Sequence, residues 1–257
     1  MSNEDRHALV CGASRGIGAA VAQRLAADGF CLTLLARNES ALHDVAAGLA
    51  NSSSHDFVAI DVADSTALGK MISEKSRRRP YTVLINNSGG PPPGSAAEAD
   101  PDSYLAAFRQ HLVANQVLLQ ALLPGMKQVR HGRIVNIIST SVKEPIAGLG
   151  VSNTIRAAVA GWAKTLAREL GPHGITVNNV LPGYTDTERL QQIFAHQAQR
   201  AERTVDEIIE LRRAEVPVGR FAEPAEIAAA VAFLASDEAA YVNGINLPVD
   251  GGRTRSQ

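Results

Sequence analysis

Short apolar runs alternate along the chain with longer segments in which apolar residues recur every three or four positions. The short runs predict seven strands, and the longer segments predict helices that cross from one strand to the next. Because the runs lack an alternating polar face, they are typical of a parallel sheet covered on both sides. The pattern predicts a single α/β domain over residues 1–257, with a doubly wound parallel seven-stranded sheet and helices on both faces. The predicted strands are 8–12, 31–36, 57–61, 82–86, 133–139, 176–181 and 245–249, and the predicted helices include 19–27, 41–50, 104–127, 156–170 and 226–234.

Composition narrows the classes of partner. The chain carries 25 basic and 26 acidic side chains, whereas proteins that neutralise many phosphates carry a basic excess. We therefore expect neither nucleic acid nor membrane as a partner, and we interpret the basic run 77–79 as the last turn of a helix. Cys11 and Cys31 lie inside predicted strands, no metal-binding pattern is present, and residues 1–7 lack the apolar segment of a secretion signal. These features favour a cytoplasmic location.

The first predicted strand ends in a glycine-rich turn that directly precedes a helix. Glycines at 12, 16 and 18 allow a tight turn and a close approach of a pyrophosphate, which the helix N-terminus stabilises. The strand before the turn and the strand after its helix supply the context that a Rossmann-type dinucleotide site requires. We interpret the turn as a cofactor site rather than a turn without ligand, made by Gly12, Ser14, Arg15, Gly16, Ile17 and Gly18.

The end of the second predicted strand indicates which nicotinamide cofactor fits. An acidic residue there binds the ribose 2′-hydroxyl of NAD and repels the 2′-phosphate of NADP. This chain has Ala36, Arg37 and Asn38 at that point, and Arg15 is expected to reach the same space. Two guanidinium groups suit a phosphate, so the sequence predicts a preference for NADP(H) over NAD(H). The alternative is that Arg37 is a solvated strand end.

These motifs resemble the short-chain dehydrogenases/reductases over nearly the whole chain. The resemblance rests on Gly-x-x-x-Gly-Ile-Gly at 12–18 and on the segments 61–62, 86–89 and 181–183, and residues 241–252 resemble the 3-oxoacyl-[acyl-carrier-protein] reductase branch. It implies that Asp61 and Val62 contact adenine, and that Asn87, Ser88 and Gly89 line the ribose and the floor of the nicotinamide site. By the same resemblance, the nicotinamide carboxamide is held by Pro182, Gly183, Thr185 and the Thr187 hydroxyl.

The chain departs from this family at the catalytic positions. Members carry a serine after the fifth strand, a tyrosine thirteen residues later and a lysine four residues after that. Here Ser139 takes the serine position, but Ser152 and Arg156 stand where tyrosine and lysine are expected, and His111 stands at the position of a catalytic asparagine. A serine hydroxyl is a weaker acid than a phenol and does not reach as far. Arg156 keeps a charge that can hold ribose hydroxyls, yet it does not readily release a proton.

Other residues are candidates for the missing proton donor. His111 titrates near neutrality, although a buried neutral imidazole tied to the backbone is the expected state. Lys143 and Tyr184 are weaker candidates, because residues of these types more often serve packing or solvation.

Two loops border the predicted substrate side. Residues 89–94 contain three consecutive prolines and predict a rigid wall, and residues 185–215 predict a helical lid, or a helical pair that only supports assembly.

Two functions follow as hypotheses. The first is an NADP(H)-dependent oxidoreductase acting on a ketone/alcohol pair of the 3-oxoacyl-thioester type, with Ser139 polarising the carbonyl and low activity on ordinary family substrates. The second is a catalytically impaired nucleotide-binding subunit that pairs with an active paralogue or binds a ligand. The resemblance also implies a homo-oligomer, a dimer or tetramer.

Overall fold

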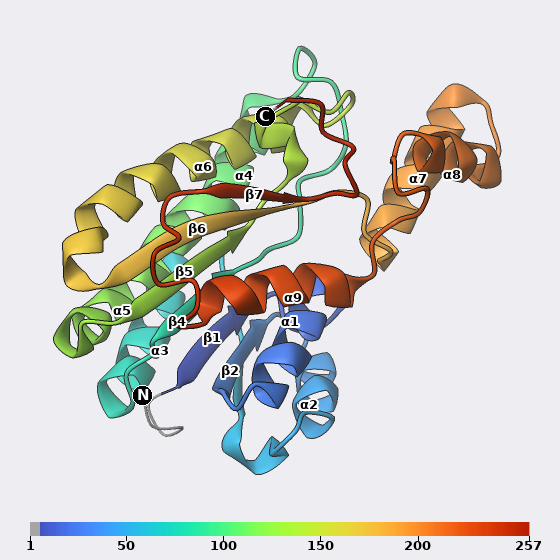
Figure 1. Cartoon of the computed structure of the whole chain (residues 1–257). Coiled ribbons are helices and arrows are strands. Elements are labelled where there is room, and N and C mark those ends of the chain that lie inside the picture. Colours follow the sequence, from blue (N-terminus) through green and yellow to red (C-terminus); the bar gives the residue numbers. More distant parts are fainter. Residues whose placement is uncertain (1–5, 257) are drawn as a thin grey trace.

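Seven parallel strands form one sheet in the computed structural model, which describes residues 6–256 (Figure 1). Their order, β3-β2-β1-β4-β5-β6-β7, reverses between β1 and β4, as in a doubly wound fold. The predicted fold class is confirmed, and each described strand end lies within two residues of its prediction. The strands are β1 (His7–Cys11), β2 (Cys31–Ala36), β3 (Asp56–Ala59), β4 (Val83–Asn86), β5 (Gly132–Ile137), β6 (Ile175–Pro182) and β7 (Asn246–Val249).

Helices cover both faces of the sheet and enclose two apolar cores. One core lies between the sheet and α1, α2 and α9, and the other lies between the sheet and α3, α5 and α6. The helices α7 and α8 project beyond the carboxyl ends of the strands (Figure 1). The helices are α1 (Gly16–Ala27), α2 (Glu39–Ala47), α3 (Ser65–Arg78), α4 (Pro101–Phe108), α5 (Ala114–Val129), α6 (Gly150–Leu170), α7 (Glu188–Ala201), α8 (Val205–Ala214) and α9 (Pro224–Ala235).

Four predicted helices need correction. The helix predicted from 19 is α1, which begins at Gly16, directly after the glycine turn. The helix predicted from 156 begins at Gly150, because Val151, Ile155 and Val159 form a buried stripe with helical spacing. The helix predicted over 41–50 is α2, which starts earlier because the Asn38 side chain accepts the Ala41 amide, and ends before Gly48. The segment predicted as one helix over 104–127 is α4 and α5, joined by a π-helical turn (Arg109–Val113).

Two smaller predictions are confirmed. The basic run 77–79 closes α3, whose last turn contains Lys75, Arg77 and Arg78. Both cysteines lie in strands, and burial raises the pKa of the Cys11 thiol to about 12, so this thiol stays protonated at neutral pH. In residues 6–256, no helix has the length and apolar character that crossing a membrane requires.

A ladder of asparagine side chains runs from the buried centre of the sheet to its exposed edge strand β7. Asn86, Asn136, Asn179 and Asn246 are register neighbours on β4, β5, β6 and β7. Each amide donates to the next carbonyl oxygen, at 2.8, 2.8 and 2.7 Å. A one-residue slip of any strand would break this chain of bonds in a buried region, so the ladder fixes the register of the strand ends that carry the site.

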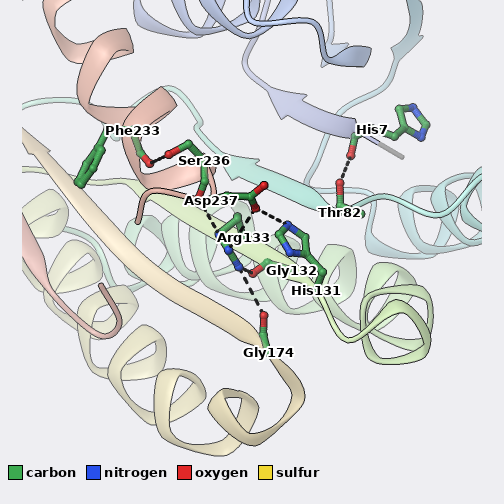
Figure 2. Close-up of polar contacts among 9 residues, drawn as sticks. All are labelled: His7, Thr82, His131, Gly132, Arg133, Gly174, Phe233, Ser236 and Asp237. Atoms are coloured by element: carbon green, nitrogen blue, oxygen red, sulfur yellow. Dashed lines mark hydrogen bonds and ion pairs between the residues drawn. The ribbon is translucent and has the colours of Figure 1, made fainter. Parts of the chain in front are cut away.

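A buried arginine lies at the amino ends of the strands (Figure 2). Arg133 at the start of β5 is 3 % exposed and donates to the carbonyl oxygens of Gly132, Gly174 and Ser236. Its Nη2 lies 3.7 Å from Asp237, which follows α9. Arg133 therefore ties the turn after α9 to β5 and β6, far from the strand ends that carry the candidate site.

Candidate active site

The glycine turn lies at the carboxyl end of β1, where the strand order reverses. Gly12 and Gly16 have φ values of +62° and +55°, which L side chains rarely adopt. A Cβ atom on Gly18 would lie 2.0 Å from the Gly12 carbonyl oxygen, and one on Gly12 would lie 2.7 Å from Asn87 Nδ2. Only glycine fits these positions, and the backbone amides that open α1 remain available to an anion. The turn thus has the geometry of a pyrophosphate cradle.

The two arginines predicted to hold a 2′-phosphate each face a carboxylate. Arg37 Nη1 lies 3.9 Å from Asp61 Oδ2, and Arg15 Nη1 donates to Glu188 Oε2 at 2.5 Å. The side chains of both pairs are largely exposed, and such pairs contribute only about 0–1 kcal/mol. A phosphate can therefore compete for either guanidinium, and the phosphate clamp stays a prediction. The pair with Glu188 also links the glycine turn to α7.

The floor of the site combines Ser88 with His111. Ser88 Oγ lies 2.7 Å from His111 Nδ1, and His111 is 2 % exposed inside the π-helical turn. Burial lowers the pKa of His111 to about 3, and the nearby Arg156 charge acts in the same direction. The imidazole is therefore neutral at pH 7, as expected. Its Nε2 is buried without a hydrogen-bond partner in the described residues.

Arg156 is buried behind this floor. Its Nη1 donates to the Ile137 carbonyl oxygen at 3.1 Å, and its Nη2 approaches the Ser88 carbonyl oxygen at 3.5 Å. Burial, with the charge of Arg189, lowers the pKa of Arg156 to about 10, so the guanidinium keeps its proton at neutral pH. The side chain reaches from α6 to the ends of β4 and β5, where a nicotinamide ribose is predicted.

The two candidate serines occupy different settings. Ser139 follows β5 and accepts the Ser141 amide through Oγ at 3.1 Å, which caps a short 3₁₀ helix (Thr140–Val142). Ser152 is half-buried in the first turn of α6 and lies one turn before Arg156. The helix therefore carries both altered positions on one face.

The end of β6 carries the predicted carboxamide site. Gly183 is packed against Asp250, because a Cβ there would lie 2.7 Å from Asp250 Cα. The Thr187 side chain caps α7 by accepting the Leu190 amide, and its methyl group would lie 3.3 Å from a Cβ on Gly16. Thr187 thus lies against the glycine turn, which agrees with a place beside the cofactor. Pro182 and Thr185 flank the same turn of the chain.

The region predicted as a lid is a helical pair with its own small core. Leu190, Phe194, Ala198 and Ile208 are buried between α7 and α8. Tyr184 packs on Phe194, and its hydroxyl donates to Glu215 at 3.1 Å. Tyr184 is therefore committed to this helical pair, which weakens its candidacy as a proton donor.

The sequence did not single out Arg189, which the structure places at the site. This residue near the start of α7 donates through Nη2 to the Pro91 carbonyl oxygen at 2.7 Å. Pro91 belongs to the proline-rich wall (residues 89–94). Backbone hydrogen bonds of Gly94 with Gly148 and Gly150 join this wall to the start of α6. No local signal separates Arg189 from the other arginines of α7 and α8, because its position depends on contacts with a segment about a hundred residues away.

Comparison with known proteins identifies the family. The family model described as Enoyl-(Acyl carrier protein) reductase matches residues 12–254. The NADPH-dependent reductase BacG of Bacillus subtilis is 34% identical over 256 residues, with 98% of each chain covered. The 3-oxoacyl-[acyl-carrier-protein] reductase FabG of Vibrio cholerae is 34% identical over 253 residues, again with 98% of each covered. The chain belongs to the short-chain dehydrogenase/reductase family.

Solved structures of this family match the whole fold. The NADPH-dependent reductase YwfH, involved in bacilysin biosynthesis, superposes with a TM-score of 0.93 at 31% identity, covering 98% of this chain and 100% of that one. A variant of the actinorhodin polyketide ketoreductase with NADPH gives a TM-score of 0.92 at 31% identity, covering 99% of each. Likeness to short-chain dehydrogenases/reductases thus extends through the helices that border the site.

Proposed function

We propose that the protein is an NADP(H)-dependent oxidoreductase that interconverts a ketone and an alcohol, with 3-oxoacyl thioesters as the model substrate class. The glycine turn carries the proposal, because Gly12 and Gly18 allow a close backbone packing that no other residue fits, and this packing leaves the amides at the start of α1 facing a position that suits a pyrophosphate. Relatives named as NADPH-dependent reductases and ketoreductases support it. Arg37 directly follows β2, where an acidic residue would indicate NAD(H), and its positive charge supports NADP(H).

The residues of the chain suit binding and orientation. The amides of the glycine turn would hold the pyrophosphate, and Arg156 would hold the nicotinamide ribose. Bound NADPH supplies a hydride to the carbonyl carbon, while the carbonyl oxygen takes one proton and becomes a hydroxyl. Ser139 would donate a hydrogen bond to that oxygen and so polarise the carbonyl.

The proton must come from another group than tyrosine. Ser152 is a weak acid on a short side chain, and Arg156 stays protonated at neutral pH. The Ser88 and His111 pair is a poor source as well, because burial lowers the pKa of His111 to about 3 and its Nε2 has no hydrogen-bond partner in the described residues that could supply a proton. Without a phenolic acid, we expect low rates on ordinary 3-oxoacyl thioesters.

A second function is favoured by the altered positions Ser152 and Arg156. A chain that keeps the cofactor cradle without an efficient proton donor can act as a nucleotide-binding subunit that pairs with an active paralogue. Assembly as a homo-oligomer, a dimer or tetramer, is proposed on the family resemblance alone.

Calorimetric titration with NADPH and NADH tests the cofactor. We expect NADPH to bind more tightly than NADH, and Arg37→Ala to weaken NADPH binding by about tenfold without affecting NADH. Arg24→Ala is the matched control, because Arg24 is an exposed arginine paired with Asp28 at the far end of α1. Failure of both cofactors to bind contradicts the oxidoreductase function. Binding without NADPH oxidation on a panel of ketones favours the subunit function.

A further inference from the structure

Two arginines converge beside the proline-rich wall without a carboxylate between them. A Cβ atom on Gly90 would lie 3.7 Å from Arg189 Nη2 and 3.8 Å from Arg156 Nη2. Apart from the neighbouring residues of the chain, no other described atom lies within 4 Å of that point. The guanidinium of α6 and the guanidinium of α7 therefore border one open position, which exists because residue 90 has no side chain.

The charges of these two arginines are not neutralised within the described residues. Arg156 donates only to backbone carbonyl oxygens, and Arg189 donates to the carbonyl oxygen of Pro91. Neither takes part in an ion pair in residues 6–256, whereas Arg212 and Arg213 on α8 each face a glutamate. Burial lowers the pKa of both Arg156 and Arg189. Two like charges without a counter-ion are unfavourable, which is typical of a site that receives an anion.

The open position lies next to the predicted reaction centre. Arg156 contacts the carbonyl oxygen of Ile137, two residues before Ser139, and Arg189 contacts the wall formed by residues 89–94. Ser139 and the Arg156 guanidinium thus belong to the same end of β5, which would let an anionic substituent next to a carbonyl held by Ser139 extend to the guanidiniums. Arginine forks match the planar geometry of a carboxylate, and one guanidinium has enough N–H groups to serve a ribose hydroxyl and an anion together.

We infer that, among the ketones of the proposed function, the preferred substrate is an oxo acid whose free carboxylate is bound between Arg156 and Arg189, so that thioesters and neutral ketones serve only as model substrates. This inference rests on the proposed function and specifies its substrate class. It also assigns Arg189 as a substrate-binding residue.

The experiment titrates the full-length protein with acetoacetate and phenylpyruvate, and with the methyl ester of each acid. Every titration is done with and without saturating NADPH, and NADPH oxidation is followed in parallel. We expect each acid to bind about tenfold more tightly than its ester, and Arg189→Gln to abolish that preference. Arg200→Gln on the same helix is the matched control, because Arg200 is exposed and lies outside the site. NADPH affinity should be equal in both variants.

Several outcomes overturn the inference. Equal affinity, or no binding, for acid and ester in both pairs would leave the two arginines without an anion to bind. Acid binding that disappears when NADPH is saturating would show that the phosphates of the cofactor occupy the guanidiniums. Inorganic phosphate binding as tightly as the acids would show a general anion site.

Failure of the proposed function is recognised separately. If NADPH does not bind, the oxidoreductase function is contradicted, while the titrations without cofactor still decide whether the arginine pair prefers a carboxylate. If NADPH binds and esters are reduced as efficiently as acids, the proposed function holds and the inference on substrate class is wrong.

Discussion

The glycine turn and the catalytic positions both lie at the carboxyl ends of the strands, yet the turn is built from backbone atoms and the catalytic positions from side chains. The turn is formed by backbone atoms and requires glycine, because a Cβ at Gly18 would lie 2.0 Å from the Gly12 carbonyl oxygen. Side chains make the catalytic part, where Ser139, Ser152, Arg156 and His111 stand. Backbone geometry tolerates few substitutions, whereas a side-chain position accepts another residue as long as the helix packs. The first region can therefore keep the character of its family while the second changes its chemistry.

Replacing a glycine of the turn should have the largest effect. Gly18→Ala forces a Cβ against the Gly12 carbonyl oxygen, so either the turn or the start of α1 must move. We expect NADPH binding to weaken by about a thousandfold, or about 4 kcal/mol, in calorimetry. Gly48→Ala is the control, because a Cβ there meets only ordinary contacts at 3.6 Å. Unchanged NADPH binding in a folded Gly18→Ala protein would mean that the cofactor does not use this turn.

Restoring the tyrosine and lysine of the family should have the second largest effect, an increase in the rate of ketone reduction. The double variant Ser152→Tyr with Arg156→Lys supplies a phenol and a lysine on one face of α6, and general acid catalysis contributes about 100-fold or more. NADPH oxidation with a 3-oxoacyl thioester measures the gain. Ser152→Phe with Arg156→Lys has nearly the same volume without the hydroxyl and should show none. No gain in the tyrosine variant would mean that the pocket, rather than the acid, limits the reaction.

Much of the fold followed from the sequence, because buried parallel strands leave apolar runs that can be counted. The glycine turn followed too, since glycine spacing is a local signal, while its role as a pyrophosphate cradle stays a prediction. The pairing of Ser88 with His111 and the approach of Arg189 to Pro91 did not, because both depend on contacts between distant segments. The early start of α6 at Gly150 had a signal in the buried positions 151, 155 and 159, which the prediction of a helix from 156 did not use.

Acid should destabilise the folded protein through the buried imidazole of the catalytic region, whereas the glycine turn contains no titratable histidine. The pKa of His111 falls from 6.5 to about 3 in the folded protein, so the unfolded chain binds more protons below pH 6.5. The stability is complete above pH 6.5 and decreases as the pH falls toward 3. Between pH 6.5 and 5 we expect His111 to account for about 2 kcal/mol of lost stability, measured by urea denaturation.

His111→Asn tests the origin of this acid sensitivity. In this variant, the part of the acid-induced loss of stability that His111 causes should disappear. The part caused by His7, whose pKa burial lowers to about 4, should remain. His7→Asn is the matched control, because His7 is buried at the start of β1, at the opposite end of the strands from the candidate site. An unchanged slope of stability against pH in His111→Asn would mean that the imidazole is not held neutral by burial.

The ion pair that joins the two regions should have the smallest effect. Glu188 of α7 holds Arg15 of the glycine turn, and both side chains are 70% exposed, so Glu188→Gln should change the free energy of unfolding by less than about 1 kcal/mol. The variant frees Arg15 for a phosphate and removes a negative charge beside it. We therefore expect NADPH to bind up to about threefold more tightly at low salt, and equally at high salt, where screening removes the difference. Glu210→Gln is the control, because Glu210 pairs with Arg213 on α8, away from the turn. Weaker NADPH binding in Glu188→Gln would instead mean that the pair holds α7 over the bound cofactor, so that the glycine turn depends on a side-chain contact after all.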